Sequence, residues 1–226
     1  MEFPKAQIIF IGDPKTGRTS LINNFTNNLM CEEEKNKNFP TQTITSCLVK
    51  VNEKKLSLSL WDVNFDHTFL RLRLYKQANI IILVYSIDSS ESLKNISEIW
   101  APQIKLCAPS ASIMLVGTKA DLRNDPAILY VLELKGQSTV TYMEGQQVAR
   151  NIGAFAYLEC NVNNVEEVDE IFHFASEKAL VDIEREVYIE KKKEAQNLKM
   201  LEMQKETKRI YKESRRLELK DHCSIS

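Results

Sequence analysis

The sequence lacks a long apolar run, a signal peptide and an excess of charge of one sign. No stretch approaches the ~20 apolar residues that a membrane-spanning helix needs. The first residues, Met1–Lys5, lead directly into a predicted strand, without the apolar region of a signal peptide. Thirty Lys and Arg residues nearly balance 31 Asp and Glu residues. We therefore expect a soluble, cytosolic protein with no general attraction to nucleic acid.

Paired cysteines are also absent. The chain has no C-x-x-C pair and no cysteine with a histidine-flanked metal spacing; its five cysteines are Cys31, Cys47, Cys107, Cys160 and Cys223. An odd, scattered set of this kind predicts free thiols in a reducing compartment.

Apolar runs alternate with helical patterns over the first 180 of the 226 residues. The runs expected to be strands are Ile8–Ile11, Leu56–Leu60, Ile80–Tyr85, Ile113–Val116 and Ala156–Glu159. The segments with helical period are Arg18–Thr26, Ser90–Cys107, Glu144–Ile152 and Val165–Ala179. This alternation predicts an α/β fold, a doubly wound and mostly parallel sheet with helices on both faces. Residues 47–60 indicate a hairpin that adds one antiparallel edge strand.

A loop bracketed by glycines follows the first strand. Gly12 and Gly17 have the spacing of G-x-x-x-x-G-K-[ST], in which backbone N–H groups surround phosphates, a cation neutralises them and a hydroxyl binds Mg²⁺. The lysine position holds Arg18, whose guanidinium is planar and wider than an ammonium group. The charge is kept and the geometry is changed. Taken alone, the pattern also fits an ordinary strand-to-helix turn.

Carboxylates follow two other strands. Asp62 ends a strand at the place of the aspartate that holds Mg²⁺ in phosphate-loop proteins, although aspartate also starts many turns. Thr118, Lys119 and Asp121 come just after a buried strand. There, the Asp121 carboxylate can accept hydrogen bonds from N1–H and N2–H₂ of guanine while the lysine stem lies over the base. A polar loop that caps a helix is the alternative.

The last predicted strand ends in Cys160, Asn161 and Val162. A backbone N–H at this place can reach the guanine O6, and a plain strand end fits the same residues equally well.

Together, these motifs resemble the Ras superfamily of small GTPases. The ordered set comprises Gly12 to Thr19, Pro40-Thr41, Trp61-Asp62, Thr118 to Asp121 and Glu159-Cys160. The Rho/Rac family is resembled more closely through Asp121-Leu-Arg123, an extra helical segment, Glu144-Gly145 and Ile152 to Phe155. The similarity covers about residues 5–180. It implies a small GTPase domain over residues 1–180, with an insert helix at about 124–138.

The resemblance implies a monomer that binds GTP or GDP with Mg²⁺ and acts in signalling related to the cytoskeleton, through effector proteins, exchange factors or Rho chaperones. The phosphate-binding positions it implies are Gly12, Asp13, Pro14, Lys15, Thr16, Gly17, Arg18, Thr19, Ser20 and Thr41. The implied Mg²⁺ ligands are Thr19, Thr41 and Asp62. The implied guanine-binding positions are Thr118, Lys119, Asp121, Cys160, Asn161 and Val162.

The chain departs from the family where hydrolysis takes place. The family's D-T-A-G-Q is replaced by Asp62-Val-Asn-Phe-Asp66, so Asp66 stands for the glutamine that orients water and Phe65 for a glycine. Pro14 replaces a glycine of the phosphate loop. Three functions therefore stay open: a GTP-bound switch with weak or absent hydrolysis, an interaction scaffold that binds nucleotide poorly, and a fully cycling GTPase.

The first switch segment departs as well. It looks about four residues longer than the Rho pattern, a change that surface loops tolerate. After Thr41, the residues Gln42 to Ser46 replace V-F-[DE]-N-[YH], so the family's usual effectors do not follow from the resemblance.

The remaining chain is charged and ends in a C-a-a-X box. Residues 181–222 contain opposite charges three residues apart, which suits a solvated helix or a disordered tail. A coiled coil is not favoured, because the apolar residues do not keep heptad register. Cys223 begins the box, whose terminal serine favours a farnesyl group, and residues 205–220 carry a local charge of +4. We expect a lipid-anchored protein at the cytoplasmic face of a membrane.

Overall fold

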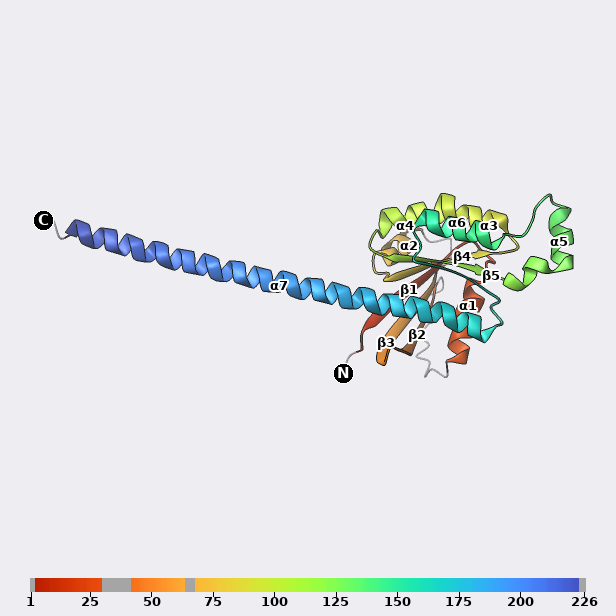
Figure 1. The fold of residues 1–226 in the computed structure, drawn as a ribbon, viewed down its shortest axis with the longest axis horizontal. Helices are drawn as coiled ribbons and strands as arrows, with labels where there is room; N and C mark the ends of the chain where they lie inside the picture. Colours follow the sequence, from red (N-terminus) through yellow and green to blue (C-terminus); the bar gives the residue numbers. More distant parts are fainter. Residues whose placement is uncertain (1–2, 30–41, 64–67, 224–226) are drawn as a thin grey trace. The chain divides into compact units, whose positions relative to one another are not determined.

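A mixed sheet forms the centre of the first compact unit of the chain (Figure 1). The computed structural model describes residues 3–29, 42–63 and 68–223. Within these residues the sheet has six strands in the order β2-β3-β1-β4-β5-β6. The strands are β1 (Lys5–Ile11), β2 (Gln42–Val51), β3 (Lys54–Val63), β4 (Ile80–Ser86), β5 (Ser112–Thr118) and β6 (Ala156–Cys160). Strand β2 pairs antiparallel to β3, and every other neighbouring pair is parallel.

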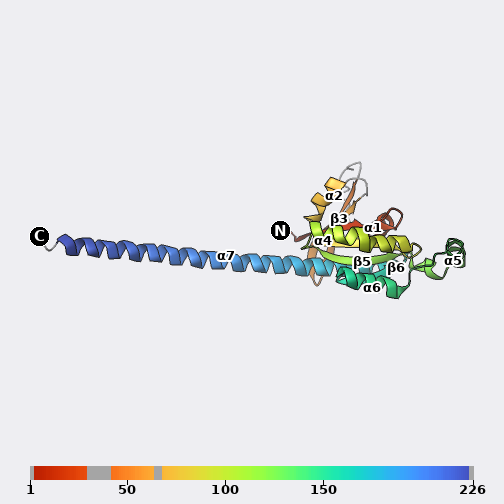
Figure 2. The same cartoon turned by 90° about the horizontal axis from the view of Figure 1, so that it is seen from above.

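Helices cover both faces of this sheet (Figures 1 and 2). They are α1 (Arg18–Asn28), α2 (Thr68–Tyr75), α3 (Ser90–Asn95), α4 (Ala101–Cys107), α5 (Pro126–Glu133), α6 (Tyr142–Ile152) and α7 (Val165–Cys223), with a π-turn η1 (Ile96–Trp100) and a 3-10 turn η2 (Ala120–Asn124). One core contains residues of α1 and of the first part of α7. The other contains residues of α2, α3, η1, α4 and α6. The predicted fold class is confirmed.

Strand β4 shows why an apolar run becomes a central strand. All seven of its residues are buried. Because successive side chains of a strand point to opposite faces, Ile80, Ile82 and Val84 join one core, while Ile81, Leu83 and Tyr85 join the other. A segment that is apolar on both faces fits only the middle of a sheet with helices on both sides.

Two helical segments differ from the sequence-based expectation. The single helix expected over Ser90–Cys107 contains the π-turn η1 immediately before α4, which has a proline in its first turn. Proline has no N–H to donate, so the regular helical pattern cannot run through Pro102 unchanged. Helix α2 was not predicted, because in its sequence Thr-Phe-Leu-Arg-Leu-Arg-Leu-Tyr leucine and arginine alternate with the period of a strand.

Helix α7 continues beyond the first compact unit. The boundary between the two units of the chain falls between Ile183 and Glu184. Residues 184–209 are exposed or nearly so, and the chain is helical to Cys223. The extension is therefore the long C-terminal helix of the predicted fold class. No helix among the described residues has the length and apolar character needed to cross a bilayer.

Candidate nucleotide-binding site

The loop between β1 and α1 lies at the carboxyl end of the sheet and winds closely over β4. A Cβ atom on Gly12 would lie 2.0 Å from the backbone oxygen of Val84, so a side chain does not fit there. Gly17, the N-cap residue of α1, has φ 85°, and Lys15 takes the left-handed conformation at φ 66°. These turns direct the loop around the N-terminus of α1, where backbone N–H groups favour anions.

Internal bonds hold this loop in place. The Thr16 hydroxyl donates to the Asp13 carbonyl at 2.8 Å. The Thr118 hydroxyl, fully buried at the end of β5, lies 2.5 Å from the carbonyl oxygen of Thr16 and 3.0 Å from that of Tyr85. Thr118 was implied to bind guanine, and the structure places its hydroxyl against the backbone of the phosphate loop.

Thr19 and Asp62 lie side by side. The Thr19 hydroxyl donates to Asp62 Oδ2, and Asp62 Oδ1 is buried without a hydrogen-bond partner. A hydroxyl and a carboxylate are oxygen ligands of the kind that Mg²⁺ takes, and Mg²⁺ keeps several waters besides them. The pair therefore fits Mg²⁺. Ser20 follows on an exposed position of α1.

Arg18 does not stay beside the loop that it follows. Its side chain reaches the end of β3, where Nη1 donates to the Val63 carbonyl at 2.8 Å and Nε lies 3.9 Å from Asp62 Oδ1. The residue is only 8% exposed. Burial lowers the pKa of its guanidinium, and the charges of Asp62 and Asp13 oppose that shift. A buried arginine keeps its charge, so a cation lies next to the Thr19–Asp62 pair.

The loop after β5 carries the predicted base-binding residues. Lys119, the N-cap residue of η2, has φ 58°, and its ammonium group lies 3.2 Å from a carboxylate oxygen of Asp88. Asp121 lies in η2 with an exposed side chain. The carboxylate of Asp121 is thus accessible, and the charge of Lys119 is balanced by the turn after β4.

The end of β6 is more enclosed. Burial raises the pKa of the Cys160 thiol to about 12, with smaller contributions from the charges of Glu167 and Asp121. The N–H of Asn161 donates to a carboxylate oxygen of Glu167 at 2.6 Å, and the carbonyl of Val162 accepts from Asn24. Of the backbone groups expected near guanine O6, the N–H of Asn161 is thus occupied by a carboxylate.

A partly buried polar network, which the sequence analysis missed, lies next to the residues predicted to bind the base. The hydroxyls of Tyr85 and Tyr157 are 2.7 Å apart, Tyr157 donates to Glu159, and Arg123 Nη2 donates to Glu159 at 2.6 Å. Burial raises the pKa of both tyrosines, and the bond to Glu159 raises the pKa of Arg123. The network joins β4 and β6 to η2. The available signal was Glu159 itself, since a carboxylate inside a strand needs a cation.

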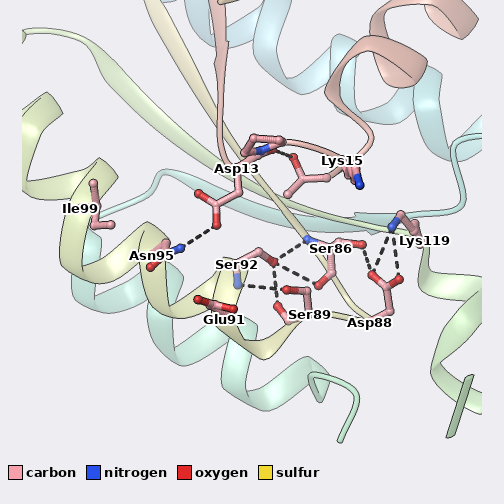
Figure 3. A pocket seen from close by; sticks show the side chains of 12 residues that line it. Asp13, Lys15, Ser86, Asp88, Ser89, Glu91, Ser92, Asn95, Ile99 and Lys119 are labelled. Atoms are coloured by element: carbon pink, nitrogen blue, oxygen red, sulfur yellow. Dashed lines mark hydrogen bonds and ion pairs between the residues drawn. The ribbon is translucent and has the colours of Figure 1, made fainter. Parts of the chain in front are cut away.

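A cleft of about 600 Å³ lies beside the phosphate loop (Figure 3). Residues 13–16 and Lys119 line one part of it, and the turn after β4 with α3 and η1 lines the other. Ser89 caps α3 by accepting from the N–H of Ser92. The cleft brings together Asp13, Pro14, Lys15, Thr16 and Lys119, whereas Arg18 turns away to β3.

Four further positions of the sequence analysis have no described side chain. Thr41 and Asp66, like Phe65, lie outside the described residues. Cys223 is the last residue of α7.

A glycine-bracketed phosphate loop, an adjacent hydroxyl–carboxylate pair and a base-side carboxylate at the carboxyl edge of this sheet define a small GTPase domain. The sequence profile of the Ras family matches residues 7–181, and the chain belongs to this family.

Two proteins of Schizosaccharomyces pombe are similar to this chain. GTP-binding protein rho2 is 34% identical over 184 residues, covering 78% of this chain and 88% of that protein. GTP-binding protein rho1 is 34% identical over 179 residues, covering 78% and 87%. The resemblance to Rho-like small GTPases is therefore confirmed at the level of the family, which binds guanine nucleotide with Mg²⁺.

We expect Gly145→Ala to destabilise the domain by about 2 kcal/mol, within the range for overpacking. Alanine normally stabilises a helix interior relative to glycine. Here, the added Cβ would lie 2.0 Å from the Tyr157 hydroxyl oxygen and 2.6 Å from that of Tyr85. Gly153→Ala is the matched control: its Cβ meets nothing within 4 Å, so only the left-handed conformation opposes it, by about 1 kcal/mol. Thermal unfolding measures both, and a more stable Gly145→Ala chain would contradict the network.

We expect Asp121→Asn to weaken GDP binding by about tenfold or more and to improve binding of xanthosine diphosphate, because an amide can donate to the extra oxygen of xanthine. One bidentate base contact is worth about 1–3 kcal/mol. Nucleotide affinities measured by competition test this, with Glu133→Gln, an exposed carboxylate of α5, as the control. Equal affinity of the unaltered chain for ATP and GTP would refute base recognition by Asp121.

Proposed function

We propose that this chain is a Rho-like, membrane-tethered signalling switch that stays mainly in its GTP-bound form, because its own hydrolysis is weak or absent. The Thr19–Asp62 pair beside the phosphate loop is the observation that carries the binding part of this proposal. A role connected with the cytoskeleton follows from the family alone.

Named residues hold each part of the nucleotide. Backbone N–H groups of residues 13–19 bind the phosphates, apart from Pro14, which has none. Thr19 and Asp62, together with Thr41, would hold Mg²⁺, which would offset the phosphate charge. On the base side, Lys119 lies against the ring and Asp121 accepts from its edge. Thr118 keeps the phosphate loop and the base loop at a fixed separation, since its hydroxyl contacts the carbonyl of Thr16.

Weak turnover follows from what hydrolysis requires. The protein must hold a water in line with the γ-phosphate and stabilise the charge that spreads over its oxygens. Asp66 is shorter than glutamine and, when ionised, only accepts hydrogen bonds. Phe65 adds bulk where a backbone N–H must approach the phosphate. Pro14 obstructs the route of an arginine finger, which is worth about 10³ to 10⁵ in rate.

An interaction scaffold that binds nucleotide poorly is the second candidate, and the position of Arg18 favours it. One nitrogen of its guanidinium is bonded to the Val63 carbonyl inside the protein. Binding phosphate through that nitrogen would require breaking a buried hydrogen bond. Chromatography of the nucleotide extracted from purified protein separates the two candidates: stoichiometric GTP supports the switch, and an empty site supports the scaffold.

Membrane tethering rests on two signals near the C-terminus. A single lipid chain on Cys223 gives only marginal binding, so a second signal is needed. Residues 205–220 carry seven basic and three acidic residues. Each basic residue near an anionic membrane surface contributes about 1 kcal/mol.

We expect single-turnover GTP hydrolysis to be slower than in Rho proteins that carry the family's glutamine, and not to be accelerated by activating proteins of the family. The double substitution Phe65→Gly with Asp66→Gln should raise the rate, because it restores the amide and the close backbone approach. Phe174→Gly with Asp169→Gln, at positions on α7, is a control that should leave the rate unchanged per folded molecule. An unaltered chain that hydrolyses GTP as fast as ordinary Rho proteins would place it among the cycling GTPases.

We expect Cys223→Ser to make the protein wholly cytosolic in fractionated cells. Charge reversal at Arg215, Arg216 and Lys220 should weaken membrane association only in part, because the lipid remains. Cys107→Ser, a cysteine of α4, is the matched control for thiol loss. Mass spectrometry that finds an unmodified C-terminus ending in Ser226 in cells would refute the lipid anchor.

A further inference from the structure

The phosphate loop contains a carboxylate that faces α3 and the π-turn. Asp13 Oδ2 accepts a hydrogen bond from Asn95 Nδ2 at 2.7 Å, which Figure 3 shows as a dashed line. Asp13 Oδ1 accepts a second bond from Trp100 Nε1 at 2.9 Å. Both oxygens of the carboxylate are therefore bonded to neutral donors of one helical segment, outside the loop.

These two donors share a face only because of the π-turn. Asn95 and Trp100 are five residues apart, and in a regular α-helix of 3.6 residues per turn they would be about 140° apart around the axis. Asn95 immediately precedes η1 and Trp100 is its last residue, and the N–H of Ala101 bonds to the carbonyl of Ile96, five residues earlier. In a π-turn, residues five apart lie roughly one turn apart, so Asn95 and Trp100 can reach the same carboxylate.

The connection is fixed at both ends. Trp100 is 1% exposed and packs in the core formed with α2, α4 and α6, so its indole cannot follow a moving loop without disturbing that core. At the other end, the Asp13 carbonyl accepts from the Thr16 hydroxyl at 2.8 Å. The side chain and the carbonyl of one residue thus tie the phosphate loop to the helix and to itself.

We propose that Asp13 is a positioning residue that couples the phosphate loop to the π-turn. Its bonds to Asn95 and Trp100 hold the loop backbone in the shape that receives phosphate, and a change in the π-turn changes nucleotide affinity. By linkage, nucleotide binding stabilises the π-turn to the same extent. The nucleotide part of this inference rests on the proposed function, whereas the link between loop and turn does not.

If Asp13 acts through its charge, its removal should change nucleotide affinity in the opposite direction from the change expected if it positions the loop. A carboxylate close to a phosphate repels it, so an aspartate that acted only through its charge would weaken nucleotide binding, and its removal would strengthen it. A positioning aspartate strengthens binding, and its removal weakens it. The two donor bonds allow an exchange that separates these effects.

The first experiment measures GDP and GTP affinity in the unaltered chain of 226 residues and in three full-length variants. Asp13→Asn keeps the size of the side chain. Its amide N–H₂ group then faces one of the two N–H donors, Asn95 or Trp100, so one hydrogen bond is lost. Asp13→Asn combined with Asn95→Asp exchanges the groups, so that both hydrogen bonds form again while the charge leaves the loop. Glu98→Gln is the control, since it removes an exposed carboxylate from the same π-turn, where Glu98 faces Lys94 at 3.8 Å.

We expect Asp13→Asn to weaken nucleotide binding by about fivefold or more, in the range of ordinary coupling between sites. The exchanged pair should return to within about threefold of the unaltered chain, and Glu98→Gln should not change affinity. Tighter binding in Asp13→Asn, the chain that loses the carboxylate, would show that Asp13 acts through repulsion. No change in either chain, or no recovery in the exchanged pair, would also overturn the proposal.

The second experiment needs no nucleotide. Hydrogen exchange in the nucleotide-free chain should become faster in Asp13→Asn at residues 96–101, and the exchanged pair should restore protection there. Unchanged exchange at the π-turn would overturn the link. If the unaltered chain binds no nucleotide, the proposed function fails, and this measurement alone decides the inference.

Discussion

The geometry of the candidate site depends on the contacts of the Thr118 hydroxyl. This hydroxyl lies fully buried between the carbonyls of Thr16 and Tyr85, and so it joins the phosphate loop to two neighbouring strands. Gly17 makes room for it, because a Cβ at that glycine would lie 3.2 Å from the same hydroxyl oxygen. The distance between the phosphate loop and the end of β5 is therefore set by a contact inside the protein.

Partly buried carboxylates make similar connections on either side of Thr118. Asp13 is bonded to α3 and the π-turn on the phosphate side. Glu159 is bonded to Arg123 and Tyr157 on the base side. A polar group away from water raises the free energy of the folded state when it loses its hydrogen-bond partner. When the bond is kept, the group is held rigidly in place. Side-chain hydrogen bonds therefore connect the phosphate loop to α3 and the π-turn, and the end of β6 to η2.

Much of the fold was predictable from the sequence, because apolar runs that are buried on both faces identify central strands without further information. The segment Ile80–Ser86 is an example. The phosphate loop was also predictable, since Gly12 is required by its close approach to Val84 of β4 and Gly17 by its close approach to Thr118 of β5. Strand and loop geometry of this kind is local, and local geometry leaves a pattern in the sequence.

Long-range bonds left no such pattern. The direction of Arg18 depends on the Val63 carbonyl 45 residues later. The partners of Asp13 lie more than 80 residues away and share a face only after the helix takes a π-turn. Helix α2 was missed for a local reason, because its alternating leucines and arginines have the period of a strand. Where a polar side chain lies depends on packing between distant segments, and the spacing of residues in the sequence does not reveal that packing.

The thiol of Cys160, at the end of β6, is expected to be unreactive. Because the residue is fully buried and the thiol pKa is raised to about 12, almost none of it is thiolate at neutral pH. Thiolate is the form that oxidants and alkylating reagents attack. This sulfur therefore packs as an apolar group at the end of β6, and we expect it not to react with peroxide or with a cysteine-directed covalent inhibitor.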